Sequence, residues 1–293
     1  MKEEKLDPKI WRTVAVVLIG PFMTQIDSTV VNVSLASIRD ALHASMNSAQ
    51  WIIGGYLLTL ALTLPLNGWL VDRIGAKRLY LGCFTAFTAS SLLCGASRSM
   101  QELICARVIQ GIGGGLLAPM TQLMIARVAG RHMARLIGYS ALPILLAPIL
   151  GPVLAGAILK FAGWPWLFYI NLPFGLLGVI LAVLLLPSDA ALKRRYPFDF
   201  LGFLLISPGL ACLLYGFDHV SQLNGAIFLS AGLILICGFV WDALRKQSLA
   251  LIDLRLFKNP VFSTATATLF LSNGVAYAGQ MLIPLYLKYS LYP

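Results

Sequence analysis

Charged side chains are scarce in this sequence. Asp, Glu, Lys and Arg make up only 12% of its 293 residues, whereas a soluble domain contains about 25%. Apolar residues account for 58% of the chain, and the mean hydropathy is +0.81. This balance excludes an ordinary soluble globular domain and indicates a protein that lies in a membrane.

Residues that commonly hold metals or form disulfide frameworks are also few. The three histidines lie in separate predicted loops, and the five cysteines fall in apolar stretches without the spacing of metal ligands. We expect the cysteines to pack as small apolar side chains. The sequence therefore predicts no metal site.

Apolar stretches long enough to cross a bilayer recur along the whole chain. A membrane-spanning helix needs about 20 mostly apolar residues, which predicts an all-α membrane protein. The nine predicted spans are 13–36, 51–71, 79–97, 103–126, 136–159, 165–187, 200–217, 226–242 and 263–287. No cleavage pattern follows the first stretch, so we expect it to be retained.

The net charge of +10 reflects membrane orientation rather than binding to nucleic acid. If the N-terminus is cytoplasmic, all Lys and Arg residues lie in inner segments except Arg39, Arg98, Arg107, Lys160 and Lys288. Cytoplasmic loops are enriched in Lys and Arg. We therefore predict a multi-pass protein of the inner (cytoplasmic) membrane that has lipid as its surroundings.

One acidic residue lies inside the first predicted span. Asp27 interrupts the apolar stretch Thr13–Ala36, and a charge at the bilayer centre costs about 2.5–3.5 kcal/mol on insertion scales. Such a residue normally faces a wet cavity or a partner charge. Asp27 is therefore the first candidate for an ion or substrate pathway.

The fourth predicted span carries a basic residue and a glycine run. Arg107 and Gln110 precede Gly111–Gly115 in ARVIQGIGGGLLAPM. The glycines allow another helix to come close, but no Gly-Lys-Ser/Thr follows, so the run is not a phosphate loop. Arg107 either reaches the outer headgroups or has a partner in the membrane. Because we find no nucleotide site, nucleophile–base pair or cofactor site, an enzyme is not expected.

Two further motifs lie between and within predicted spans. The inner loop GWLVDRIGAKRLY contains Gly68, Asp72, Arg73 and Gly75, and its glycines permit a tight turn and close helix approach. Asp72 can accept hydrogen bonds from a helix N-terminus or pair with Arg73. Taken alone, this segment also fits an ordinary positively charged inner loop.

The stretch LLAPILGPVLAGAI places two prolines and two glycines in one predicted helix, which should bend and pack closely. These residues are Pro148, Gly151, Pro152 and Gly156. On physical grounds alone, an ordinary kinked membrane helix remains the alternative.

Together these motifs resemble the major facilitator superfamily. The loop from Gly68 is similar to the inner-loop signature of that family, R-x-x-Q-G-x-G-x-G from Arg107 to its fourth-helix motif, and G-P-x-x-x-G from Gly151 to its antiporter motif. The segments IDSTVVNVSL and WPWLFYINLPFGLL, with the two extra helices at 200–217 and 226–242, resemble the 14-helix drug:proton antiporters of the EmrB/QacA type.

The resemblance implies a facilitator fold with three parts. Residues 1–187 would form the N-terminal six-helix half, 188–258 two central linker helices, and 259–293 the start of an incomplete C-terminal half. Because facilitators rock two halves around a midplane site, this chain would be an N-terminal piece of a longer exporter.

The resemblance also implies a function. We expect proton-coupled export of amphipathic, cationic drugs, with Asp27 and Arg107 coupling the proton. Gln25, Asn32 and Gln110 are weaker cavity candidates that equally fit helix packing. The partners would be a proton, a small-molecule substrate and, in some relatives, a periplasmic adaptor. The alternatives are a transport-inactive fragment and a facilitator for another small solute.

Overall fold

The regular elements that the computed structural model describes are all helices. It describes residues 7–189, 197–220, 222–246 and 250–291. In chain order the elements are α1 (Pro8–Ala41), α2 (Met46–Thr63), η1 (Leu64–Leu66), α3 (Asn67–Ile74), α4 (Ala76–Ala96), α5 (Met100–Ala129), η2 (Gly130–His132), α6 (Met133–Phe161), α7 (Trp166–Tyr169), α8 (Asn171–Leu185), α9 (Phe200–Asp218), α10 (Leu223–Lys246), η4 (Leu254–Lys258) and α11 (Pro260–Leu291).

The predicted all-α membrane fold is confirmed, and each predicted span corresponds to helical structure. Most of the helices extend several residues beyond the predicted spans, and polar side chains cap the starts of three of them. Ser45, Ser99 and Asp199 each accept a hydrogen bond from a backbone N–H three residues further on. Within the described residues, seven helical stretches are long and apolar enough to cross a membrane, and one of them, Met100–Phe161, contains both α5 and α6.

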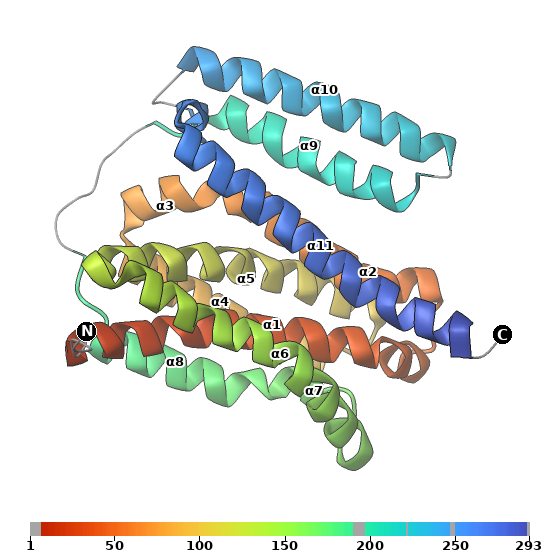
Figure 1. Ribbon diagram of the computed structural model, residues 1–293. Coiled ribbons are helices and arrows are strands. Elements are labelled where there is room, and N and C mark those ends of the chain that lie inside the picture. The colour runs from red at the N-terminus through yellow and green to blue at the C-terminus, as the bar shows by residue number, and fades with distance from the viewer. Residues whose placement is uncertain (1–6, 190–196, 221, 247–249, 292–293) are drawn as a thin grey trace.

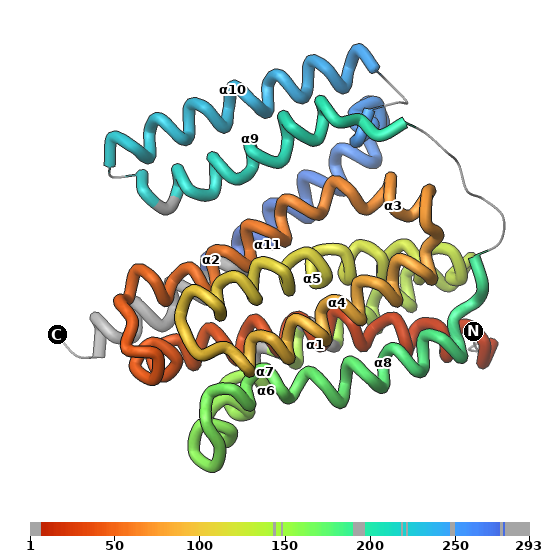
Figure 2. Tube along the Cα trace, turned by 180° about the vertical axis from the view of Figure 1, so that it is seen from behind, coloured from red at the N-terminus to blue at the C-terminus, as the bar shows by residue number. Residues whose placement is uncertain are grey.

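The helices run roughly side by side (Figure 1), and α1 and α5 lie inside the first bundle, which consists of α1 to α8. Helix α1 packs against α5, α6 and α8, while α5 also contacts α2 and α4. Helices α9 and α10 form a hairpin that packs against α2. Helix α11 crosses in front of the bundle in Figure 1 and lies behind it in Figure 2. Residues of α1 and α5 are therefore surrounded by neighbouring helices.

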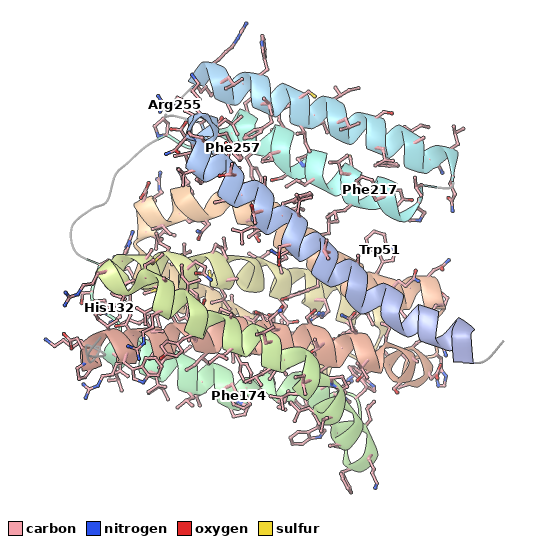
Figure 3. The ribbon with its side chains drawn as sticks, viewed as in Figure 1. Trp51, His132, Phe174, Phe217, Arg255 and Phe257 are labelled. Carbon is pink, nitrogen blue, oxygen red and sulfur yellow. The ribbon has the colours of Figure 1, made fainter. Side chains whose placement is uncertain are left out.

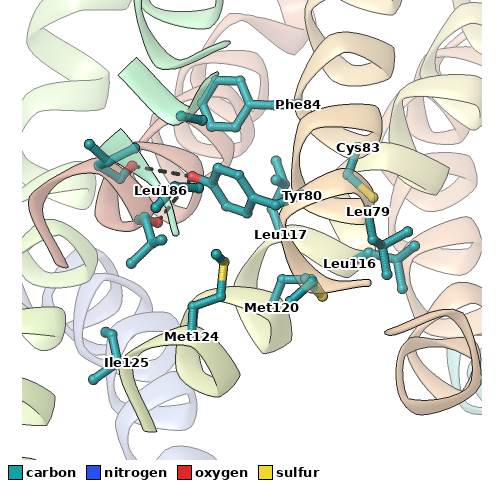
Figure 4. Packing of buried hydrophobic residues seen from close by; sticks show 14 of the residues in the cluster. Leu79, Tyr80, Cys83, Phe84, Leu116, Leu117, Met120, Met124, Ile125 and Leu186 are labelled. Carbon is teal, nitrogen blue, oxygen red and sulfur yellow. Dashed lines mark hydrogen bonds between the residues drawn. The ribbon is translucent and has the colours of Figure 1, made fainter. Parts of the chain in front are cut away.

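Two apolar clusters fill the first bundle. The first contains Tyr80, Phe84 and Leu117 (Figure 4), and the Tyr80 hydroxyl donates to the carbonyl oxygens of Val16 and Val17 at 3.3 and 3.2 Å. The second cluster contains other residues of α1, α2, α4 and α5, joined by residues of α6 and α7. This apolar packing fixes the positions of α1, α4, α5 and α8 around the polar residues between them.

Large apolar side chains also cover the outside of the molecule. Trp51, Phe174 and Phe217 extend away from the bundle (Figure 3) and are 46%, 43% and 67% exposed. A soluble monomer seldom exposes such extensive apolar surface. The exterior is therefore suited to lipid, as the composition predicts.

Candidate functional site

A fully buried ion pair lies inside the first bundle. Arg107 of α5 donates through Nη1 to Oδ2 of Asp27 on α1 at 2.5 Å, and their side chains are 1% and 0% exposed. The acid in the first span therefore has a partner charge, and Arg107 does not reach the outer headgroups. The family resemblance implied that these two residues act together, and the structure brings them into contact.

Neutral side chains complete the cluster around the pair. Asn171 donates to Oδ1 of Asp27 at 2.7 Å, and Gln110 donates to the same oxygen at 3.3 Å. Gln110 also accepts from Arg107 at 2.5 Å and donates to Ser91 at 2.7 Å. The carboxylate therefore has donors from two helices besides its own, α5 and α8.

The remaining surroundings of Arg107 are suited to a cation. Its Nε donates to the carbonyl oxygen of Ile52 at 3.3 Å, and its guanidinium carbon lies 4.1 Å from the ring centre of Tyr56. The Phe168 ring centre is 5.8 Å away. Aromatic faces attract cations, most strongly where water is excluded. Arg107 thus has favourable contacts in addition to Asp27.

Burial makes this cluster sensitive to a change in charge. Two buried ions are tolerated when they pair well and their other hydrogen-bonding groups are satisfied, whereas removing one partner leaves an uncompensated charge. A proton added to Asp27 or a cation brought to it alters that balance directly. The arrangement can therefore respond to proton uptake with a change in helix contacts.

The glycine run after Gln110 allows α5 to approach both neighbours. A Cβ at Gly111 would lie 2.8 Å from the carbonyl oxygen of Tyr56 on α2, and a Cβ at Gly113 would lie 2.7 Å from that of Cys83 on α4. Contacts this short with backbone atoms leave no room for a side chain. The close helix approach predicted from the glycine spacing is confirmed, and it brings α2 and α4 close to α5 beside Gln110.

Two of the weaker site candidates lie outside the cluster. Asn32 is exposed, and Gln25 is half-buried on α1. Neither makes a hydrogen bond to the Arg107–Asp27 pair among the described residues. Of the five candidates for proton or substrate contact, the structure therefore groups Asp27, Arg107 and Gln110.

Sequence reasoning missed three members of the cluster. Asn171 stands in the segment WPWLFYINLPFGLL, which was used only for its family resemblance, and Ser91 and Tyr56 lie in apolar spans. A single Asn in such an apolar segment is a detectable signal, because an amide in a membrane helix needs a partner. A Ser or Tyr in an apolar span carries no comparable signal.

The inner-loop motif divides into residues with and without a visible structural role. Gly75 has φ +98° and ψ 152°, and a Cβ there would collide with Asp189. A Cβ at Gly68 would meet nothing within 4 Å, so the close approach expected at Gly68 is not found. Arg73 lies 5.2 Å from the ring centre of Trp69.

Helix α4 is capped by a different aspartate from the one expected. Asp189, which follows α8, accepts from the backbone N–H groups of Lys77 and Arg78 at 3.0 and 3.2 Å. Lys77 Nζ in turn donates to the carbonyl oxygens of Val183 and Leu186 at the end of α8. Asp72 has no such contact among the described residues, because the chain after α8 already occupies this helix end.

The antiporter-like motif lies in the continuous helix α6. Gly151 is buried against α1, where a Cβ would collide with Thr29, and Thr29 Oγ1 lies 3.4 Å from the carbonyl oxygen of Ala147. Pro152 and Gly156 are exposed, and a Cβ at Gly156 would meet nothing within 4 Å. The side chain of Pro148 lies outside the described part of the structure. Close packing is therefore found at Gly151 but not at Gly156.

An apolar pocket of about 550 Å³, open to the surface, lies away from the ion pair, between α2, η1, α3, α5 and α9. Its lining includes Pro65, Pro119 and Leu210, with Asn67 as a polar member. Within the described residues, no three His, Cys, Asp or Glu side chains lie together as metal ligands would.

A second polar cluster fixes the end of the α9–α10 hairpin at which α9 begins and α10 ends. Asp199 accepts from Lys246 Nζ at 2.7 Å, from the Gly202 N–H at 2.9 Å and from the Leu251 N–H at 3.0 Å. Burial raises the pKa of Asp199, but these hydrogen bonds outweigh burial and hold the pKa below its ordinary value of 3.8. Asp199 therefore joins the start of α9, the end of α10 and the following loop.

Comparisons with known proteins agree with this architecture. The family model of the Major Facilitator Superfamily matches residues 17–292. The "Multidrug resistance protein B homolog" of Mycobacterium tuberculosis (strain CDC 1551 / Oshkosh) is 35% identical over 292 residues, covering 97% of this chain and 54% of that protein. The "Putative multidrug resistance protein MdtD" of Yersinia pestis (strain Pestoides F) is 38% identical over 256 residues, covering 85% and 54%. The chain thus spans about half the length of the curated relatives it matches.

Solved structures show the same fold at low identity. The human organic anion transporter MFSD10 superimposes with a TM-score of 0.54 at 18% identity, covering 72% of this chain and 56% of that chain. The partially occluded, inward-open xylose transporter XylE from E. coli gives 0.55 at 15% identity, covering 78% and 57%. At these identities the likeness concerns the fold alone.

Proposed function

Because the chain belongs to the Major Facilitator Superfamily, we propose that it forms part of a proton-coupled antiporter that exports amphipathic, cationic compounds across the cytoplasmic membrane. The observation that carries this proposal is the buried ion pair between Arg107 of α5 and Asp27 of α1. The names of the relatives, which are multidrug resistance proteins, support the substrate class.

Proton uptake would act on the ion pair. Asp27 takes one proton on Oδ2 from water on the outer side, which makes the carboxyl neutral and ends its charge attraction to Arg107. Arg107 keeps its charge and its contacts with Gln110, the Ile52 carbonyl and the Tyr56 ring. Helices α1 and α5 are then free to shift relative to each other.

Proton release would complete the exchange. When Asp27 gives the proton to water on the inner side, its carboxylate is again available to a cation. A cationic substrate that reaches this carboxylate competes with Arg107, so substrate and proton are bound alternately. Export with proton entry follows if the substrate leaves on the side where the proton enters.

The orientation and the remaining motifs fit the same scheme. The Lys and Arg distribution favours a cytoplasmic N-terminus. The contacts of Gly75 and Lys77 with the segment after α8, and that of Gly151 with α1, join helices that would move as one unit. We assign these residues to the conformational change and Asp27 and Arg107 to coupling.

Transport in proteoliposomes tests the proposal. The complete reading frame that encodes this chain is reconstituted with a pH difference across the membrane, and accumulation of a fluorescent lipophilic cation is measured. We expect pH-driven accumulation by the wild type and its loss in Asp27→Asn, while the control Asp40→Asn, which alters an exposed carboxylate, transports normally.

Three results would count against the proposal. Undiminished pH-driven accumulation by Asp27→Asn would remove Asp27 from coupling. Accumulation of the solute down a proton gradient, in the same direction as the proton, would indicate a facilitator for solute import. Absence of transport by the wild type, together with unchanged drug susceptibility on deletion, would favour a transport-inactive product.

A further inference from the structure

We propose that Asn171 is the positioning residue of the exchange: it holds the Asp27 carboxyl in place in both protonation states while Arg107 attaches and detaches. This inference rests on the proposed function above. It adds a residue from α8 to a coupling site that otherwise consists of side chains from α1 and α5.

The two oxygens of the Asp27 carboxylate accept hydrogen bonds from two different helices. Arg107 of α5 is bonded to Oδ2 at 2.5 Å, and Asn171 of α8 is bonded to Oδ1 at 2.7 Å. Gln110 also reaches Oδ1, but at the longer distance of 3.3 Å, and it lies on the same helix as Arg107. Asn171 is therefore the stronger donor to Oδ1 and the one that does not move with α5.

The chemistry of an amide suits this role. The side-chain N–H of Asn171 carries no charge, so it can donate to a carboxylate oxygen and, more weakly, to the carbonyl oxygen of a protonated carboxyl. A proton on Oδ2 ends the attraction to Arg107 and leaves the bond from Asn171 to Oδ1 intact. Asp27 is thereby kept aimed at the position to which Arg107 must return.

Because Asn171 is buried, its hydrogen bond to Asp27 is difficult to replace. Asn171 is 1% exposed, and its Nδ2 also lies 3.4 Å from Ser91 Oγ on α4. Water cannot easily replace the lost donor at such a site, so the Asp27 oxygen would lose most of its hydrogen bonding. Asn171 also follows the α7 segment closely, so a movement of that segment reaches Asp27 through one side chain.

Charged and titratable groups approach Asp27 from α5, α2 and α4. Arg107 faces it from α5, Tyr56 from α2 and Cys94 from α4. Helix α8 contributes the neutral Asn171, and the titratable side chains of α6 lie towards its two ends. Arg107 is thus the cation whose position depends on the charge of Asp27.

Infrared spectroscopy of the reconstituted protein tests the inference directly. The band of the protonated Asp27 carboxyl is identified as the carboxyl band that disappears in Asp27→Asn. In Asn171→Ala we expect this band to move to higher wavenumber, because the carbonyl oxygen has lost its closest donor. The matched control is Asn32→Ala, which removes the same side chain from an exposed position on α1, and the band should not move.

Transport supplies the second readout. We expect Asn171→Ala to lower the rate of pH-driven exchange by about tenfold or more, because losing a hydrogen bond to a charged group changes an equilibrium constant by more than about tenfold. The pH profile of the residual exchange should also be displaced from that of the wild type. Asn171→Ser, which keeps a hydrogen-bond donor and a small volume, should recover part of the rate and covers the case in which the alanine variant does not fold.

The results separate the two proposals. An unmoved carboxyl band in both Asn171→Ala and Asn171→Ser overturns the positioning role, as does an unchanged pH profile. If Asp27→Asn keeps pH-driven export but the band still moves in Asn171→Ala, the proposed function fails while the contact stands, and Asn171 then has no role in exchange.

Discussion

Removing the charge of Arg107 should lower the free energy of unfolding far more than removing the charge of an exposed arginine. Arg107→Met keeps the length of the side chain but leaves the Asp27 carboxylate, which is 0% exposed, with only amide donors. Breaking a buried ion pair by removing one partner costs about 3–5 kcal/mol. We therefore expect the free energy of unfolding to fall by about this amount.

Two further variants isolate the cause. Arg39→Met removes an ion pair with Asp40 whose side chains are 33% and 66% exposed, and such surface pairs contribute about 0–1 kcal/mol. Adding Asp27→Asn to Arg107→Met removes the unpaired charge, so most of the lost stability should return. The double variant should unfold within about 2 kcal/mol of the wild type.

The assay is a titration of the chain in mixed micelles with a denaturing detergent, followed by tryptophan fluorescence. The reasoning is refuted if Arg107→Met costs no more than Arg39→Met. It is also refuted if the double variant is as unstable as Arg107→Met alone, because the loss would then come from packing rather than from the orphaned carboxylate.

Three smaller predictions follow from the helix contacts. Gly75→Ala should lower the free energy of unfolding by about 1–3 kcal/mol, because the backbone conformation at this position is nearly confined to glycine. Gly68→Ala should have no such effect. Equal effects of the two variants in thermal melts would contradict this prediction. Gly113→Ala should lower the free energy of unfolding by about 1–3 kcal/mol by forcing α5 away from α4. Gly82→Ala, where a Cβ meets nothing within 4 Å, should leave it unchanged. An unchanged melting temperature in Gly113→Ala would contradict this prediction. The lowered pKa of Asp199 stabilises the fold above the ordinary value of 3.8 and ceases to do so as pH falls through the lowered pKa. Melting temperatures between pH 7 and pH 2 should therefore fall less steeply in Asp199→Asn, and parallel curves would show that Asp199 makes no contribution.

The fold could be predicted from the sequence because the bilayer imposes length and polarity on each helix. Apolar stretches located the α-helices of the described residues, although the spans 51–71 and 165–187 each cover two α-helices and the 3-10 helices η2 and η4 lie outside every span. Several helix ends were short by a few residues because polar caps such as Ser45 and Ser99 lie beyond the apolar part. The glycine run beside Arg107 also predicted close packing, since a missing side chain is visible in the sequence.

The site could be predicted only where a residue contradicts its surroundings. Asp27 and Arg107 are charges in apolar spans, so both were found. Asn32 and Gln25 occupy the same helix as Asp27, but sequence spacing does not say which face of α1 meets the bundle. Asp189 was missed because capping of α4 by a residue more than a hundred positions away depends on tertiary packing.

The most direct test of coupling separates two kinds of transport by the Asp27→Asn variant. Reconstituted vesicles are loaded with substrate, and labelled substrate is supplied outside, once at equal concentrations without a pH difference and once against a concentration gradient with a pH difference. The proposed mechanism predicts that the variant still exchanges labelled for unlabelled substrate, at a lower rate because the carboxylate that attracts the cation is gone, but no longer accumulates it against the gradient. Accumulation equal to that of the wild type would contradict the assignment of the proton to Asp27.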